Sequence, residues 1–189
     1  MVTRELGRHT CALCADAAER DHVIMPFLRD GLGRGERCLV RLNPRDVDAL
    51  TRAPTNGIDL AASTASRQLQ VLDDQYATAS TDELLASWER TVAEAVTVDD
   101  YPAVRMIIGL TQERRRPGSD GLIRYESAIN DLVLRHPVTV LCLYDAGTVD
   151  GGMIIDLVRT HSQALVTGSS YANPYCLTSS TRLADPEDG

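Results

Sequence analysis

The sequence predicts an α/β protein with three layers, in which a mostly parallel β-sheet is flanked by helices. Continuous apolar blocks, typical of strands buried on both faces, alternate along the chain with amphipathic stretches of helical period. This alternation is typical of parallel sheets, because each crossover between strands carries a helix. The 189 residues, 43% of them hydrophobic, are enough for one full core. We therefore expect a single domain over residues 1–178 and an acidic, frayed tail over 179–189.

The strands are expected at the apolar blocks. The block at 104–110 is uninterrupted and is therefore expected to be a central strand. The stretch 52–66 is the least periodic, and no element is expected there. In chain order the expected strands are 9–14, 38–42, 68–72, 104–110, 138–144 and 163–166.

Most of the expected helices begin after a side chain that can cap them. Asp16 and Ser80 are each followed three residues later by a glutamate, which is the spacing of a capping box. Asn43 stands before Pro44, the preferred order of an N-cap and a first-turn proline. Pro26 is expected to kink the first helix or limit where it starts. Helices are expected after residue 16, after 43, after 80, over 121–135 and from 150 through 159.

The composition excludes several classes of function. The chain has no lysine, so a Schiff-base lysine, a lysine general base and the lysine of a phosphate-binding P-loop are all excluded. The net charge of −8 opposes direct binding to nucleic acid or to an anionic membrane. The sequence shows no signal peptide and no apolar run near the ~20 residues that span a bilayer. We expect a cytoplasmic protein whose five cysteines are reduced.

A His-x-Cys-x-x-Cys block opens the first expected strand. His9, Cys11 and Cys14, with Cys142 from a later strand, carry imidazole and thiolate groups that suit zinc or iron. However, residues 9 and 11 point to one face of a strand and residue 14 points to the other. Buried cysteines are also common packing residues. No cofactor is therefore expected, and a metal- or redox-responsive sensor built on these four residues stays open as an alternative.

Glu126 falls on the apolar stripe of the helix over 121–135, four residues after Leu122 and three before Ile129. A carboxylate in that position needs a hydrogen-bond partner, an arginine or a polar pocket. Either it is paired with an arginine for structural reasons or it is a polar anchor for a ligand.

A third block lies near the C-terminus. The carboxyl ends of parallel strands face the crevice in which α/β proteins bind ligands, so Tyr144 and Asp145 are expected to line a pocket with His161. His161 with Asp145 or Asp156 could form the acid–base pair of a hydrolase or transferase. Because no nucleophile motif accompanies this pair, we expect that the protein is not an enzyme.

Several sequence blocks arrive in an order that resembles one known family. They are His9-x-Cys11-Ala12-Leu13, the Phe-Leu-Arg-Asp-Gly-Leu-Gly-Arg-Gly-Glu run over 27–36, Arg124-Tyr125-Glu126, residues 141–145, residues 156–161 and Asn173-Pro174-Tyr175. The order resembles the MEDS family, the sensory domain named from DcmR-type regulators of methanogens and methylotrophs. The resemblance extends from about residue 9 to residue 176. Within it, Cys14 and Cys176 stand where the family leads us to expect Tyr, and no Trp stands between Arg105 and Tyr125.

The resemblance implies a RecA/KaiC-like fold that is used for sensing instead of ATP hydrolysis. Residues 12–20, where such an ATPase has its P-loop, contain neither glycine nor lysine. The strand at 106–109 has no aspartate for magnesium. We therefore expect that the P-loop has been lost, with degenerate nucleotide binding as a minor alternative.

The resemblance also implies where a ligand binds and where its signal goes. In a RecA-like strand order the strands of Cys11 and Cys142 are neighbours, which gathers the candidate residues around one crevice. A small, weakly polar molecule is the expected ligand. An anti-sigma-type kinase or a STAS-type antagonist is the expected kind of partner, and an oligomer is possible. The expected ligand-binding residues are His9, Cys11, Tyr125, Glu126, Cys142, Tyr144, Asp145, His161, Asn173 and Tyr175.

Overall fold

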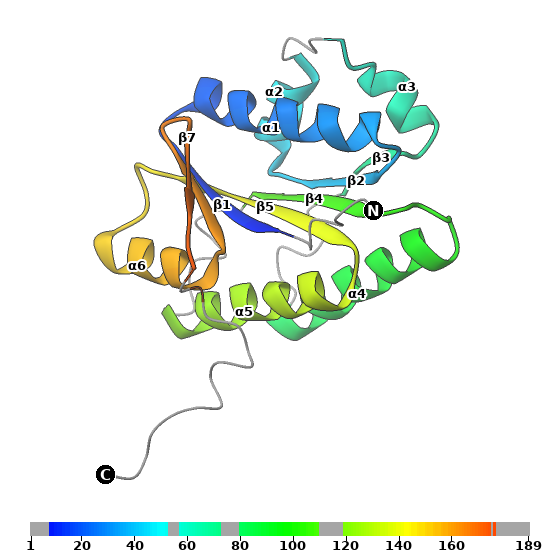
Figure 1. Cartoon of the computed structure of the whole chain (residues 1–189). Coiled ribbons are helices and arrows are strands. Elements are labelled where there is room, and N and C mark those ends of the chain that lie inside the picture. Colours follow the sequence, from blue (N-terminus) through cyan, green and yellow to red (C-terminus); the bar gives the residue numbers. More distant parts are fainter. Residues whose placement is uncertain (1–7, 53–56, 73–79, 110–118, 175, 177–189) are drawn as a thin grey trace.

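The computed structural model describes residues 8–52, 57–72, 80–109, 119–174 and 176. Its strands form one seven-stranded sheet in the order β3-β2-β4-β5-β1-β6-β7, in which only the β6–β7 pair is antiparallel. Helices cover both faces of the sheet (Figure 1), so the predicted three-layer α/β class is confirmed. The tail at 179–189 lies outside the described residues.

The predicted strands are present within a residue or two of their expected ends. β1 occupies the expected range. β5 lies between β4 and β1 at the centre of the sheet, so the strands that carry Cys11 and Cys142 are neighbours, as predicted. β7 was not predicted, because its four residues are all exposed and carry no apolar pattern. The strands are β1 His9–Cys14, β2 Arg37–Arg41, β3 Leu69–Val71, β4 Val104–Gly109, β5 Val138–Asp145, β6 Gln163–Val166 and β7 Ser169–Ala172.

The helices begin at the predicted caps. The Asp16 side chain accepts from the Glu19 amide, and Ser80 and Glu83 form a complete capping box. α1 continues through Pro26 to Gly33, so the proline neither delays nor ends the helix. α3 was not predicted, because it has no buried residue. The helices are α1 Ala17–Gly33, α2 Pro44–Arg52, α3 Leu60–Ala65, α4 Thr81–Thr97, α5 Ser119–Arg135 and α6 Gly151–Thr160.

Two apolar cores lie on opposite faces of the sheet. One is formed under α4, α5 and α6 and contains Cys11, Trp88 and Cys142. The other is formed under α1 and α2 and contains Cys14 and Cys38. Successive residues of a strand point to opposite faces, so Cys11 and Cys14 belong to different cores, as their spacing predicted.

The run over 27–36 has a structural role at the amino end of the sheet. Arg105 of β4 lies over the Phe27 ring, 4.8 Å from its centroid, and pairs with the carboxylates of Asp30 and Glu36. A Cβ atom on Gly31 would lie 2.3 Å from Arg105 Cδ. Gly31 therefore leaves the space in which this arginine connects α1 to the sheet.

Candidate functional site

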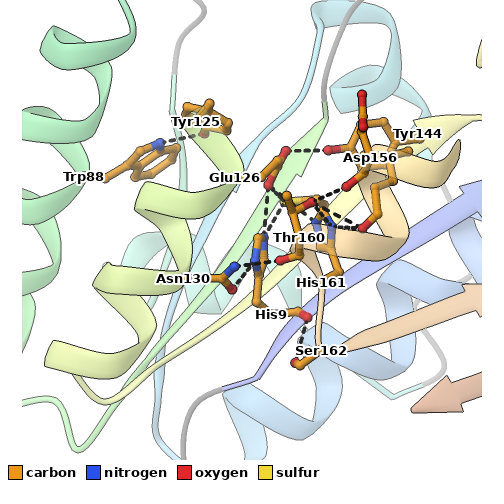
Figure 2. A network of polar contacts seen from close by, with 12 residues as sticks. His9, Trp88, Tyr125, Glu126, Asn130, Tyr144, Asp156, Thr160, His161 and Ser162 are labelled. Atoms are coloured by element: carbon orange, nitrogen blue, oxygen red, sulfur yellow. Dashed lines mark hydrogen bonds and ion pairs between the residues drawn. The ribbon is translucent and has the colours of Figure 1, made fainter. Parts of the chain in front are cut away.

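A buried polar cluster lies between the sheet and helices α5 and α6, centred on the Glu126 carboxylate. Glu126 extends from α5 toward β1 and β5 (Figure 2) and has no exposed surface. The Tyr144 hydroxyl donates a hydrogen bond to its Oε1, and its Oε2 lies 3.1 Å from His9 Nε2 and 3.4 Å from His161 Nε2. Of the two alternatives that the sequence left open for Glu126, pairing with an arginine is therefore wrong: two imidazoles and a phenol surround the carboxylate.

The imidazole of His9 is held in one orientation from its far side. Its Nδ1 donates to Asn130 Oδ1 at 2.9 Å, and Asn130 Nδ2 donates to the Thr160 carbonyl at 2.6 Å. The carbonyl partner of Nδ2 fixes which end of the amide is oxygen, so the proton of a neutral His9 sits on Nδ1. Its Nε2 then presents a lone pair to Glu126.

His161 is held in the same way. Its Nδ1 lies 2.8 Å from the Leu157 carbonyl, which can only accept, so Nδ1 carries the proton of the neutral ring. His161 Nε2 is buried and has no hydrogen-bond partner among the described residues. The two rings are adjacent, with centroids 4.0 Å apart. Two imidazole lone pairs thus converge on one carboxylate oxygen.

Cys142 of β5 adds a sulfur atom to the same point. Its Sγ lies 3.3 Å from His9 Nε2 and 3.7 Å from Glu126 Oε2. Cys11 is its neighbour in register on β1. Burial, together with the nearby Glu126 charge, raises the pKa of the Cys142 thiol well above its ordinary value and raises the pKa of Cys11 to about 12. Without a cation in the cluster, both thiols are protonated.

The two imidazoles also set the ionisation of the cluster. Burial acts to raise the pKa of Glu126, but the positive charge that His161 or His9 carries when protonated, together with the hydrogen bond from the Tyr144 hydroxyl, offsets burial and holds that pKa below its ordinary value. Burial and the neighbouring His9 lower the pKa of His161 to about 3. The cluster therefore holds a carboxylate and a neutral His161 imidazole in the interior.

A separate crevice lies at the carboxyl ends of β1, β2, β4 and β5. Its volume is about 580 Å³. Apolar atoms of Leu42 and Leu143 line it beside Cys14, Tyr144 and Asp145. This is the place at which open α/β sheets bind ligands. Tyr144 is one of the residues at the edge of this crevice, but its side chain is buried on the α5 face of the sheet, where its hydroxyl donates to Glu126.

The phosphate position in this crevice is closed by the protein's own acids. Only Ala15 and Asp16 separate β1 from α1. The Asp16 carboxylate accepts from the Glu19 amide at 2.8 Å, and Glu19 Oε2 accepts from the Ala15 amide at 2.8 Å. These are amides at the start of the helix, where a phosphate would bind. The P-loop lacks its glycines and lysine, as predicted, and in addition two of the amides that would bind phosphate are already occupied by carboxylates of the chain.

Residues 8–162 match the family described as MEthanogen/methylotroph, DcmR Sensory domain (MEDS). The chain belongs to the MEDS family. A solved KaiC-like protein from the hyperthermophilic archaeon Pyrococcus horikoshii has a similar fold, with a TM-score of 0.54 and 14% sequence identity over 84% of this chain and 70% of that one. A search of the curated proteins finds no match. The RecA/KaiC-like fold that the sequence predicted is confirmed.

The MEDS domain brings most of its predicted site residues together, but not all in one place. Within the buried cluster lie His9, Glu126, Cys142, Tyr144 and His161, with Cys11 beside them. Since the four possible metal-ligating groups are at most 1% exposed, they form an interior cluster and do not line the open crevice.

The other predicted residues have different positions. Asp145 lines the crevice, and its carboxylate accepts from the Gly147 amide. Tyr125 packs in the core, where its hydroxyl accepts from Trp88 Nε1 at 3.3 Å. Asn173 Nδ2 donates to the His161 carbonyl at 3.1 Å. Tyr175 lies outside the described residues.

The structure does not bring together two sets of residues that the sequence offered as alternatives: the four-residue metal set with Cys14, and His161 with Asp145 or Asp156. Cys14 packs on the α1 face, so it cannot share an ion with His9 and Cys142 in the proposed four-residue set. The Nε2 of His161 faces Glu126 and not Asp145 or Asp156, so the acid–base pair of a hydrolase is not formed. Asn130 and Thr160 complete the cluster and were missed. Asn130 follows Glu126 by one helical turn, and this spacing could have identified it.

Among the described helices, none has the length and apolar character that crossing a membrane requires.

Proposed function

We propose that this MEDS domain is a non-catalytic sensor that binds a small, weakly polar molecule in the crevice at the carboxyl end of the sheet. The crevice carries this proposal. Its volume of about 580 Å³ falls within the range of small-molecule sites. Its lining combines leucine and alanine side chains with charged and polar groups, which suits a ligand that has both apolar and polar parts.

The charges around the crevice support a neutral ligand. Three arginines and three aspartates line it, and they balance one another: Arg20, Arg45, Arg52, Asp16, Asp46 and Asp145. Arg20 is already paired with Asp46. A highly charged ligand such as a nucleotide would meet the closed amides after β1, so nucleotide binding is not proposed.

A bound ligand would be reported through Tyr144 and α6. Tyr144 contacts both the crevice and Glu126, and Glu126 contacts His161 at the end of α6. Ile154, Ile155 and Val158 of α6 are 39–56% exposed and offer an apolar contact to a partner protein. A signalling protein of the anti-sigma-kinase or STAS type is the class of partner that we propose.

The experiment is native mass spectrometry of protein purified from its own host, followed by a thermal-shift screen of small alcohols, ketones, amines and halogenated hydrocarbons. Ala49 of α2 lines the crevice, so Ala49→Trp should fill it and abolish ligand binding. Ala61→Trp, at an exposed alanine of α3, is the matched control and should bind as the wild type does. Equal binding by both variants would place the ligand elsewhere.

A further inference from the structure

We propose that a zinc ion binds at the centre of the buried cluster, held by four side chains: His9, Glu126, Cys142 and His161. These are a pair of imidazoles, a thiolate and a carboxylate, all of which are groups that zinc accepts. This set differs from any that the N-terminal His-x-Cys-x-x-Cys block offers. It takes its members from β1, α5, β5 and the residue after α6.

Four of the six separations between the donor atoms are close to those around one tetrahedral ion. With Zn–N and Zn–O distances of about 2.0–2.2 Å and Zn–S of about 2.3 Å, the donors of a regular tetrahedron lie roughly 3.3–3.6 Å apart. His9 Nε2 lies 3.1 Å from Glu126 Oε2 and 3.3 Å from Cys142 Sγ. Glu126 Oε2 lies 3.4 Å from His161 Nε2 and 3.7 Å from Cys142 Sγ. All four donor atoms lie within 4.8 Å of one another.

The outer contacts prepare both histidines as ligands. A zinc-bound histidine usually donates its other N–H to a carbonyl or carboxylate, which fixes the tautomer and leaves a lone pair for the metal. His9 makes this contact to the Asn130 amide oxygen and His161 makes it to the Leu157 carbonyl. The second oxygen of Glu126 accepts from Tyr144, so the carboxylate is also oriented from behind.

A cation also resolves an electrostatic conflict in the cluster. A proton on His9 Nε2 would satisfy the contact between His9 and Glu126. It would leave the buried His161 Nε2 with its lone pair directed at a negative oxygen and no donor to meet it. Leaving a buried polar atom without a partner is costly. A divalent ion at the centre accepts all the lone pairs at once.

The charges of the complete site sum to zero. When the ion binds, the Cys142 thiol loses its proton to solvent and becomes a thiolate. The thiolate and the Glu126 carboxylate together carry two negative charges, which a divalent cation neutralises. A neutral assembly is what a fully buried site requires, because an uncompensated charge in the interior is expensive.

The closed coordination favours zinc in a structural or sensory role over a catalytic metal. Four protein ligands fill a tetrahedron, whereas a catalytic zinc keeps one position open for water or substrate. None of the four residues lines the crevice. The proposal therefore stands whether or not the crevice binds a small molecule.

The test is the metal content of the full chain, measured by elemental analysis and native mass spectrometry, after purification without added metal and again after unfolding with a chelator and refolding with zinc. We expect one equivalent of zinc per chain. Refolding with cobalt should give visible d–d bands typical of a tetrahedral site and a near-ultraviolet thiolate-to-cobalt band. A wild-type protein that folds without metal and takes up no zinc or cobalt would overturn the proposal, as would iron as the only bound metal.

Cysteine variants then identify the ligand. Cys142→Ser should remove the thiolate-to-cobalt band and lower zinc affinity at least tenfold, while Cys38→Ser, at a buried thiol on the other face of the sheet, should keep both. Cys11→Ser distinguishes the neighbouring thiol and should also keep both. If Cys11→Ser lost the band and Cys142→Ser kept it, the ligand set would be wrong. Should Cys142→Ser not fold, His161→Gln takes its place and should lower zinc affinity while keeping the thiolate band.

Discussion

The hydroxyl of Tyr144 donates a hydrogen bond to the buried carboxylate of Glu126, and the same tyrosine lines the crevice at the carboxyl end of the sheet. In the function proposed above, this residue is the route by which a molecule in the crevice would affect the buried cluster. It also places a charged acceptor at full burial, where the loss of a donor is costly.

Tyr144→Phe should therefore lower the free energy of unfolding by about 2–3 kcal/mol, because a hydrogen bond to a buried charge is lost. The measurement is urea denaturation in the presence of a chelator, followed by the fluorescence of Trp88, the one tryptophan of the chain. Tyr125→Phe is the matched control. Among the described residues its hydroxyl bonds the neutral Trp88 indole, so the expected loss is about 1 kcal/mol. Equal losses in the two variants would mean that Glu126 is not ionised.

Gly31→Ala should destabilise the protein by about 1–3 kcal/mol, because the added methyl group overlaps Arg105, whose head group is held by Phe27 and two acids. Thermal or urea denaturation measures this. Gly33→Ala, two residues later in the same helix, meets no atom within 4 Å and should be neutral or slightly stabilising. If both variants were neutral, Arg105 would not be fixed in the space beside Gly31.

The Cys14 thiol should react slowly with alkylating reagents at neutral pH. Burial and the nearby Glu19 carboxylate raise the pKa of Cys14 to about 11. At pH 8 its thiolate fraction is then about one-thousandth, against roughly a quarter for an unperturbed thiol of pKa 8.5. Iodoacetamide labelling of the folded protein, read by peptide mass mapping, should accelerate about tenfold per pH unit above pH 8. A rate at Cys14 that levels off near pH 9, as it will in the urea-unfolded control, would contradict this.

Millimolar Mg-ATP should leave the thermal midpoint unchanged, because Asp16 and Glu19 occupy the amides that would bind phosphate. A rise of several degrees would show that the turn between β1 and α1 opens. Asp16→Ala should lower stability by about 1 kcal/mol through loss of the N-cap, and it should not create nucleotide binding, since no lysine is available.

The parts of this structure that could be predicted from sequence are those set by local chemistry. The helix caps at Asp16, Ser80 and Asp150 and the buried strands each depend on a short run of neighbouring residues. α3 and β7 were missed because neither carries an apolar pattern: α3 has no buried residue, and β7 is exposed along its whole length and forms by backbone pairing with β6. The family resemblance supplied the strand order, which local patterns alone do not determine.

The candidate site was harder to predict for a related reason. The membership of His9, Glu126, Cys142 and His161 in one site was expected, but the direct contact of Glu126 with both imidazoles was not. Glu126 was recognised as a buried carboxylate in need of a partner, and an arginine is the usual partner. His9 and Asn130 lie 121 residues apart in the sequence, so only the assembled fold brings the Asn130 amide to the His9 ring. The separation of an interior cluster from an open crevice likewise depends on side-chain burial that no sequence pattern gives.

The two-residue turn between β1 and α1 has a consequence for physiology. A KaiC-like fold that retained its phosphate loop would respond to the cellular ratio of ATP to ADP. Here the amides at the start of α1 already donate to the chain's own carboxylates, so they are not available to bind the phosphates of adenine nucleotides. We therefore expect the proposed sensor to respond independently of the cellular ratio of ATP to ADP.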